Sequence, residues 1–203
     1  EQELNATERV ELIARLARLY LLHEPNDEAF IQWVEKGRQL RPDHPELVKL
    51  LIQFHEEHNN TRELVPLLSW YVNYLEARRQ LDQAAQYALQ LARHHINDNN
   101  WNEAGVYARM VNRYAPDNEE GVLLLGEVLE HTKEWELARK LYEQALQLPE
   151  NPANEALRTE VLYRIAHTSS MLNETTKALD CLQRCLDRDS SHEKAKTLAQ
   201  SLS

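Results

Sequence analysis

The chain has 203 residues and a formal net charge of −10, because its 33 acidic side chains outnumber its 23 basic ones. No stretch of eighteen apolar residues occurs, so the sequence excludes a helix that spans a bilayer. The acidic balance and the lack of a basic stripe argue against a nucleic-acid partner and favour a protein partner.

The composition favours helices. Only four glycines and seven prolines occur, whereas the good helix formers Leu, Ala, Glu, Gln and Arg are abundant. Cys181 and Cys185 lie four residues apart in a helical pattern, so we expect them to pack as small apolar side chains. They favour a reducing compartment such as the cytoplasm, and a periplasmic domain of an anchored protein is the alternative. The chain begins at Glu1 without a methionine, so we expect a piece of a longer protein.

A pattern of large, small and aromatic residues recurs along the chain with a period of 34. It is clearest at Val122, Leu125, Gly126, Leu129, Ala138, Tyr142 and Ala145. Thirty-four residues earlier, the same positions hold Ala88, Leu91, Ala92, His95, Ala104, Ala108 and Val111. Trp101 and Trp135 are separated by the same interval. Such a period indicates a repeated supersecondary unit.

Five units follow in chain order: residues 10–43, 44–77, 85–118, 119–152 and 159–192. The pattern resembles the tetratricopeptide repeat, whose signature is a large residue, Leu, a small residue and an aromatic, then Ala, an aromatic and Pro. The resemblance implies an all-α fold, a right-handed superhelical solenoid of antiparallel helix pairs. We expect a single array over residues 1–203, with residues 193–203 as a capping helix.

The resemblance also assigns packing positions within the units. The small residues Ala17, Ala92, Gly126 and Ala166 are expected to let neighbouring helices approach closely, as are Ala29, Ala104, Ala138 and Ala178 in the second helices. In the first unit, the second helix is expected to pack through Ala29, Trp33 and Lys36.

The second unit, 44–77, is degenerate. Glu63 stands where Ala is expected, Leu51 occupies the small position, and the second helix is expected to run on to Gln80. The alternative is a join between two sub-arrays, 1–60 and 61–203. The same helix carries Trp70, Tyr71 and Tyr74, which we expect to pack a joint between units. The alternative use of this aromatic group is to bind a partner.

No catalytic constellation is found, so we expect no enzyme, no metal and no cofactor. His55-Glu56-Glu57-His58 resembles a metalloprotease motif, but its histidines are three residues apart where four are needed. No glycine-rich phosphate loop occurs, and paired charges along the helices are explained by solvated faces.

In the tetratricopeptide family the first helices line a concave groove, through the second, fifth, ninth and twelfth positions of each unit. The groove residues predicted in this way are Arg18, Ile52, His55, Arg93, Glu127, Glu130, Tyr163 and His167. The N-terminal half of this face is expected to be apolar with two arginines, and the C-terminal half acidic. A merely soluble inner face is the alternative.

Members of the family that bind chaperone tails clamp a carboxylate with Lys, Asn and Arg at defined positions. Here those positions hold Ala14, Arg18, Lys49, Gln86 and Gln90, so a carboxylate clamp for chaperone tails is not expected. The predicted function is a protein–protein interaction scaffold or adaptor that binds a peptide or helix. The alternatives are a domain of a larger bacterial envelope or polymer-secretion assembly, and a module that self-associates through its terminal helices.

Overall fold

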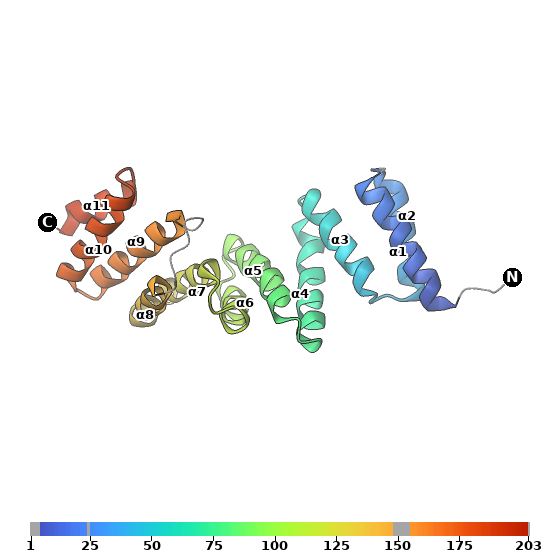
Figure 1. Cartoon of the computed structure of the whole chain (residues 1–203), viewed down its shortest axis with the longest axis horizontal. Helices are drawn as coiled ribbons and strands as arrows, with labels where there is room; N and C mark the ends of the chain where they lie inside the picture. Colours follow the sequence, from blue (N-terminus) through green and yellow to red (C-terminus); the bar gives the residue numbers. More distant parts are fainter. Residues whose placement is uncertain (1–4, 24, 148–154, 203) are drawn as a thin grey trace. The chain divides into compact units, whose positions relative to one another are not determined.

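The computed structural model describes residues 5–23, 25–147 and 155–202, which form eleven α-helices and no strand (Figure 1). In chain order the helices are α1 (Ala6–Leu22), α2 (Asp27–Leu40), α3 (Pro45–Glu57), α4 (Thr61–Ala77), α5 (Leu81–Asn97), α6 (Trp101–Tyr114), α7 (Glu119–His131), α8 (Trp135–Leu146), α9 (Glu155–Met171), α10 (Thr175–Arg188) and α11 (Glu193–Leu202). The all-α prediction is confirmed. None of these helices combines the length and apolar character that a bilayer crossing requires.

The chain divides into two compact units, residues 1–87 and residues 88–203, called unit 1 and unit 2. The division falls inside α5, between Tyr87 and Ala88, and not at residue 60. In unit 1, α1 packs on α2 and α3, and α3 packs on α4. In unit 2, α7 packs on α8, α9 on α10, and α11 on both α9 and α10. The expectation of a single array over residues 1–203 stays a prediction.

Polar caps fix where several helices begin. The Asn5 side chain accepts a hydrogen bond from the Glu8 backbone N–H at 3.0 Å, and the Glu8 carboxylate accepts one from the Asn5 N–H at 2.9 Å. Asn118 caps α7 in a similar way, because its side chain accepts the Gly121 N–H at 2.8 Å. α3 begins with Pro45, which has no N–H to satisfy.

One type of tight turn joins five pairs of consecutive helices. Each turn spans three residues, and its central residue has a positive φ: Asn59, Arg79, Asn99, Lys133 and Asn173. Asparagine adopts this conformation more readily than most residues, which suits it to three of the five positions. The turn around Arg79 ends α4 at Ala77, so the expectation that this helix runs to Gln80 is wrong.

The small residues of unit 2 allow the close helix packing that the pattern predicts. Ala104, Ala138 and Ala178 are completely buried. A Cβ atom built on Gly126 would overlap the ring of Tyr142, which is itself completely buried. α7 and α8 can therefore approach this closely only because residue 126 has no side chain.

The first unit packs one residue out of the expected register. The residues of α2 that are buried are Phe30, Val34 and Gly37, whereas Lys36 is exposed and Ala29 and Trp33 are only partly covered. The cause is the connection between α1 and α2, since four residues separate Leu22 from Asp27 where three separate the helices of the tight turns. The extra residue rotates the helix by about 100° relative to the expected pattern.

The same shift appears in α4 but not in α3. Leu64 and Leu68 take the buried positions of α4, whereas Leu50, Leu51 and Phe54 of α3 pack in one core cluster with Ala17, as the expected register requires. Glu63 is exposed, so it does not replace a packed alanine. The second helix of this unit therefore looks degenerate mainly because its expected register was one residue early.

Candidate protein-binding surfaces

A surface hollow of about 450 Å³ lies in unit 1, between α1 and the start of α3. It is lined by Glu11, Ala14, Arg15, Arg18, His44, Pro45 and Glu46. Arg18 was predicted from the repeat pattern as a groove residue, and the structure places it here. Its guanidinium lies 2.8 Å from the Glu46 carboxylate, and both side chains are about half exposed. We call this hollow the α1–α3 hollow.

The α1–α3 hollow carries both signs of charge. Glu11 and Glu46 contribute carboxylates, and Arg15 and Arg18 contribute guanidinium groups. Burial and the neighbouring charge of Arg41 lower the pKa of His44, so its imidazole is neutral near pH 7. The Nδ1 atom of His44 is buried, and no hydrogen-bond partner for it occurs within the described part of the chain.

Two further predicted groove residues of unit 1 are less accessible. Ile52 is only 2% exposed, so its assignment to an open groove is corrected. Its burial reflects the covering of α3 on most of its sides, since the buried residues of this helix are Leu47, Val48, Leu50, Leu51, Ile52 and Phe54. His55 is half-buried, its Nδ1 has no hydrogen-bond partner in the described residues, and burial lowers its pKa.

The predicted groove residues of unit 2 lie on α5, α7 and α9. Arg93 forms an ion pair with Glu120, and both side chains are a little less than half exposed. Glu127 is half-buried, and no ion pair of Glu127 occurs in the part of the chain that the structure describes. The negative charge expected on the C-terminal half of the groove face is thus partly neutralised, because Glu120 already pairs with Arg93.

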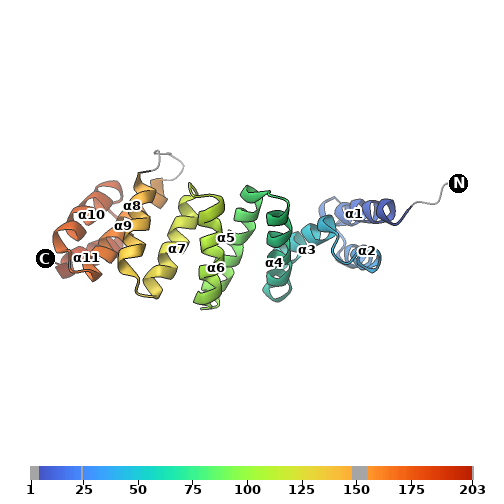
Figure 2. The same cartoon turned by 90° about the horizontal axis from the view of Figure 1, so that it is seen from below.

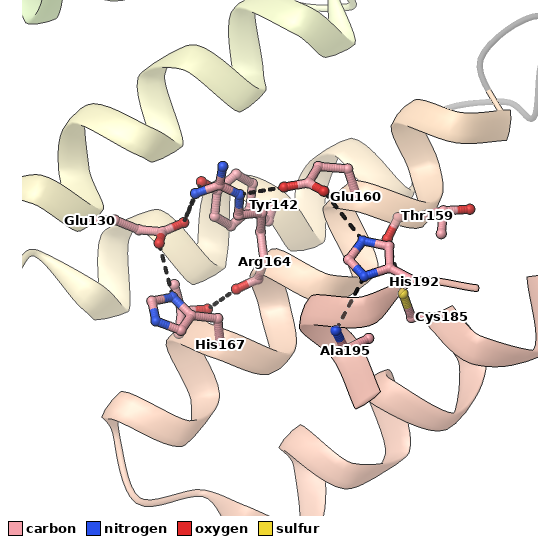
Figure 3. A network of polar contacts seen from close by, with 10 residues as sticks. Glu130, Tyr142, Thr159, Glu160, Arg164, His167, Cys185, His192 and Ala195 are labelled. Carbon is pink, nitrogen blue, oxygen red and sulfur yellow. Dashed lines mark hydrogen bonds and ion pairs between the residues drawn. The ribbon is translucent and has the colours of Figure 1, made fainter. Parts of the chain in front are cut away.

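Glu130 is a buried centre of polar contacts and not an open groove residue (Figure 3). The Tyr142 hydroxyl donates to its carboxylate at 2.7 Å, and Nδ1 of His167 lies 2.9 Å from the other carboxylate oxygen. Arg164 adds a longer contact at 3.5 Å. Burial by itself would raise the pKa of Glu130, but the hydrogen bonds from His167 and Tyr142 and the charge of Arg164 hold it below its usual value.

The contacts continue from Arg164 toward the C-terminal helix. Nε of Arg164 donates to Glu160 at 2.7 Å, and Glu160 in turn lies 3.4 Å from Nε2 of His192. Nδ1 of His192 accepts the backbone N–H of Ala195 at 3.2 Å, at the start of α11. Figure 3 shows this chain of contacts running from Glu130 to Ala195. It ties α7, α9 and α11 together.

Aromatic rings accompany this polar chain on α9. The Tyr163 ring lies 6.3 Å from that of His167 in a stacked arrangement and 5.1 Å from that of His192. Trp135, at the start of α8, meets the His167 ring edge-on at 6.0 Å. Tyr163 also lines a second hollow, of about 410 Å³, formed with residues of α11. The predicted residues Tyr163 and His167 therefore lie in one neighbourhood with Glu130.

Sequence reasoning missed Arg164, Tyr142 and His192 as members of this network. A signal for one of them was present, because Glu130 and Arg164 have opposite charges and are one repeat period of 34 residues apart. Residues one period apart lie on equivalent positions of neighbouring units, so such a pair can be expected to meet. Among the described residues, no group of three or more His, Cys, Asp or Glu side chains could hold a metal ion.

Solved structures of other proteins share this arrangement of helices. YrrB, described as a TPR protein with an unusual peptide-binding site, is 12% identical and matches over 97% of this chain and 92% of its own, with a TM-score of 0.69. A MamA protein is 12% identical over 93% of this chain and 96% of its own, with a TM-score of 0.67. MamA from Desulfovibrio magneticus RS-1, from residue 41 to its end, is 16% identical over 79% of this chain and 84% of its own, with a TM-score of 0.63.

At these identities the likeness concerns the fold. The chain has the helical repeat fold of tetratricopeptide proteins, as its 34-residue pattern predicts. Figure 2 shows the successive helices of the array from a second direction. No family model matches the chain, and no curated protein matches its sequence.

Proposed function

We propose that this protein is a protein-interaction scaffold, which holds an extended peptide or a helix of its partner against the first helices of its repeats. The observation that carries the proposal is the α1–α3 hollow. Its volume of about 450 Å³ is large enough to receive side chains of a bound segment, and it lies on first-helix positions. Repeat arrays commonly use such faces for extended binding surfaces.

The charges of the hollow suit a polar segment of a partner. The Arg18–Glu46 pair is half exposed on both sides, so solvent screens it and it adds little to stability. Arg18 can therefore exchange Glu46 for an acidic group of a partner at small cost, and Glu46 can do the same for a basic group. The description of YrrB as a TPR protein with a peptide-binding site supports the same kind of ligand.

Selection from a random peptide library displayed on phage tests this function. The purified chain should enrich a set of related peptides, and Arg18→Glu should weaken their binding because it reverses a charge in the α1–α3 hollow. Arg38→Glu is the matched control, since Arg38 is an exposed arginine of α2 that does not line the hollow. Failure to enrich any peptide, or equal losses for both variants, would contradict the proposal.

Self-association is a second candidate, favoured by an apolar stripe on α1. Leu12, Leu19 and Leu22 are 44%, 37% and 46% exposed and lie on one side of that helix. A second copy could cover them. Sedimentation velocity over a range of concentrations should then show a dimer or larger species that Leu19→Lys disperses. A monomer at every concentration would exclude this candidate.

A further inference from the structure

The hydrogen bond to Glu130 fixes which nitrogen of the His167 imidazole acts as the donor. An ionised carboxylate can only accept hydrogen bonds, so Nδ1 of His167, 2.9 Å from the Glu130 oxygen, must carry the hydrogen. In the neutral ring, Nε2 is then an acceptor with a free lone pair. Figure 3 shows this second nitrogen pointing away from Glu130. No partner for it is found in the described residues, and about a third of the side chain is exposed.

The surroundings of this nitrogen carry an excess of negative charge. Glu130, Arg164 and Glu160 together sum to one negative charge, and both carboxylates of the group already bind Arg164. Glu127 lies one turn before Glu130 on the same side of α7, and it adds a second negative charge with no ion pair in the described chain. The Arg164 guanidinium is mostly covered, so it does not offer this surface a free cation.

Aromatic rings flank the same position. Tyr163 stacks beside His167, and Trp135 approaches it edge-on from α8. The faces of tyrosine and tryptophan attract cations through their ring electrons. A lone acceptor nitrogen and two aromatic rings therefore lie together on one part of unit 2, and each of them attracts a positively charged donor. The Glu127 carboxylate, one helical turn from Glu130 on α7, adds to that attraction.

We propose that this surface binds a basic side chain, lysine or arginine, of the partner segment, with His167 Nε2 and Glu127 as acceptors and Tyr163 as the stacking face. The inference rests on the proposed scaffold function and adds the chemistry of one contact. Glu130 is a positioning residue, because it acts only by fixing the ring of His167. Tyr142 supports it by donating to the Glu130 carboxylate at 2.7 Å.

The test uses three immobilised peptide libraries that are random except for one central residue, which is lysine, glutamine or glutamate. The wild-type chain should bind the lysine library about fivefold or more above the glutamate library, as a cation–π contact with an added carboxylate would give. Glu127→Gln should remove most of this preference. His167→Phe should do the same, because the ring shape remains while the acceptor is lost.

His131→Gln is the matched control, since His131 is an exposed histidine of unit 2 that lies at the end of α7 and stacks on Trp101. The His131→Gln variant should keep the wild-type preference for the lysine library. Circular dichroism and melting curves of each variant separate lost binding from lost folding. Glu127 makes no hydrogen bond or ion pair with the network in the described residues and acts on Tyr142 only through its charge, so its variant remains informative even if His167→Phe destabilises unit 2.

The possible outcomes separate the two proposals. Binding of the libraries without any preference for lysine would overturn this inference and leave the scaffold function intact. A lysine preference that survives both Glu127→Gln and His167→Phe would place the basic side chain elsewhere and overturn it as well. Failure of every library to bind would overturn the scaffold function and this inference together.

Discussion

Gly126 is the glycine of unit 2 at which an added Cβ would have least room. A methyl group there would overlap the buried ring of Tyr142, whose hydroxyl is fixed on Glu130. We expect Gly126→Ala to destabilise the protein by about 1–3 kcal/mol, as other overpacked core positions do. Chemical denaturation followed by circular dichroism measures the change.

Gly105→Ala is the control for that substitution. A Cβ at Gly105 would meet Val128 at 3.2 Å and the mobile end of the Arg109 side chain at 3.1 Å, contacts that small shifts can relieve. Gly105→Ala should lower the free energy of unfolding clearly less than Gly126→Ala does. Equal costs at both glycines would mean that the Tyr142 ring can move aside.

Trp70 shows how an aromatic residue can serve packing without being fully buried. Its ring stacks on Tyr74 at 5.3 Å and lies 6.4 Å from the buried Tyr71. We expect Trp70→Ala to lower the free energy of unfolding by about 3 kcal/mol, because a large side chain and two ring contacts are lost.

Trp70→Phe retains a stacked ring and should cost clearly less than the alanine variant. Both values come from urea denaturation of the full chain. If Trp70→Ala leaves the stability unchanged, the ring contributes little to packing and its use as a partner contact becomes the better hypothesis.

At the scale of the helix, the shifted register of α2 gives a test of the packing of unit 1. Phe30 is completely buried and stacks on Phe54 at 4.8 Å, whereas Trp33 is only partly covered. Phe30→Ala should destabilise by about 3–5 kcal/mol. Trp33→Ala should cost less, although tryptophan is the larger residue. The reverse order, measured by thermal melts, would restore the register that the repeat pattern predicts.

Helix positions were therefore easier to predict than the face that each helix buries. The helix pairs follow from the recurrence of small and large residues, because only close-packed hairpins need such spacing. The register of unit 1 could not be read in the same way. Ala29 and Phe30 are both apolar, so the pattern fits either face of α2. One extra residue before Asp27 decides between them, and its effect depends on turn geometry.

The candidate surfaces show the same limit. Arg18, Tyr163 and His167 could be placed on the first helices of their units from their positions in the repeat, and Arg18 and Tyr163 line surface hollows there. The burial of Glu130 could not, because a carboxylate at a groove position is usually solvated and only its contacts with Tyr142 and Arg164 explain its covering. Those contacts depend on side-chain packing across three helices, which a one-dimensional pattern does not contain.

At the scale of the whole molecule, two half-buried histidines are expected to make stability depend on pH. Burial lowers the pKa of His55 in unit 1 and of His94 in unit 2. In the unfolded chain these rings take up a proton near the ordinary value of about 6.5, and the folded chain resists protonation until lower pH. Because the unfolded state binds more protons over this range, stability is greatest above the ordinary pKa and falls as the pH decreases through it.

Melting temperatures measured at about pH 7.5 and about pH 5.5 should therefore show a lower value in acid. Replacing both rings, in the variant His55→Gln with His94→Gln, should reduce the difference. His58 acts in the opposite direction, since its contacts with the Phe54 carbonyl and Asp27 raise its pKa, but it is largely exposed. A wild-type chain with a higher melting temperature in acid would contradict the prediction that His55 and His94 govern the pH dependence of stability.

The recurring tight turn gives residues 60–99 the same kind of connection at both ends. Arg79 follows Asn59 by 20 residues and Asn99 follows Arg79 by 20, so residues 60–99 hold two whole helices between two copies of one turn. Excising them joins Asn59 to Asn100 and recreates an Asn-Asn turn sequence in front of Trp101. Because an even number of helices is lost, the helices that follow keep their up-and-down order. We therefore expect that a pair of helices is the unit in which the length of the array can be changed while every remaining connection keeps its turn type.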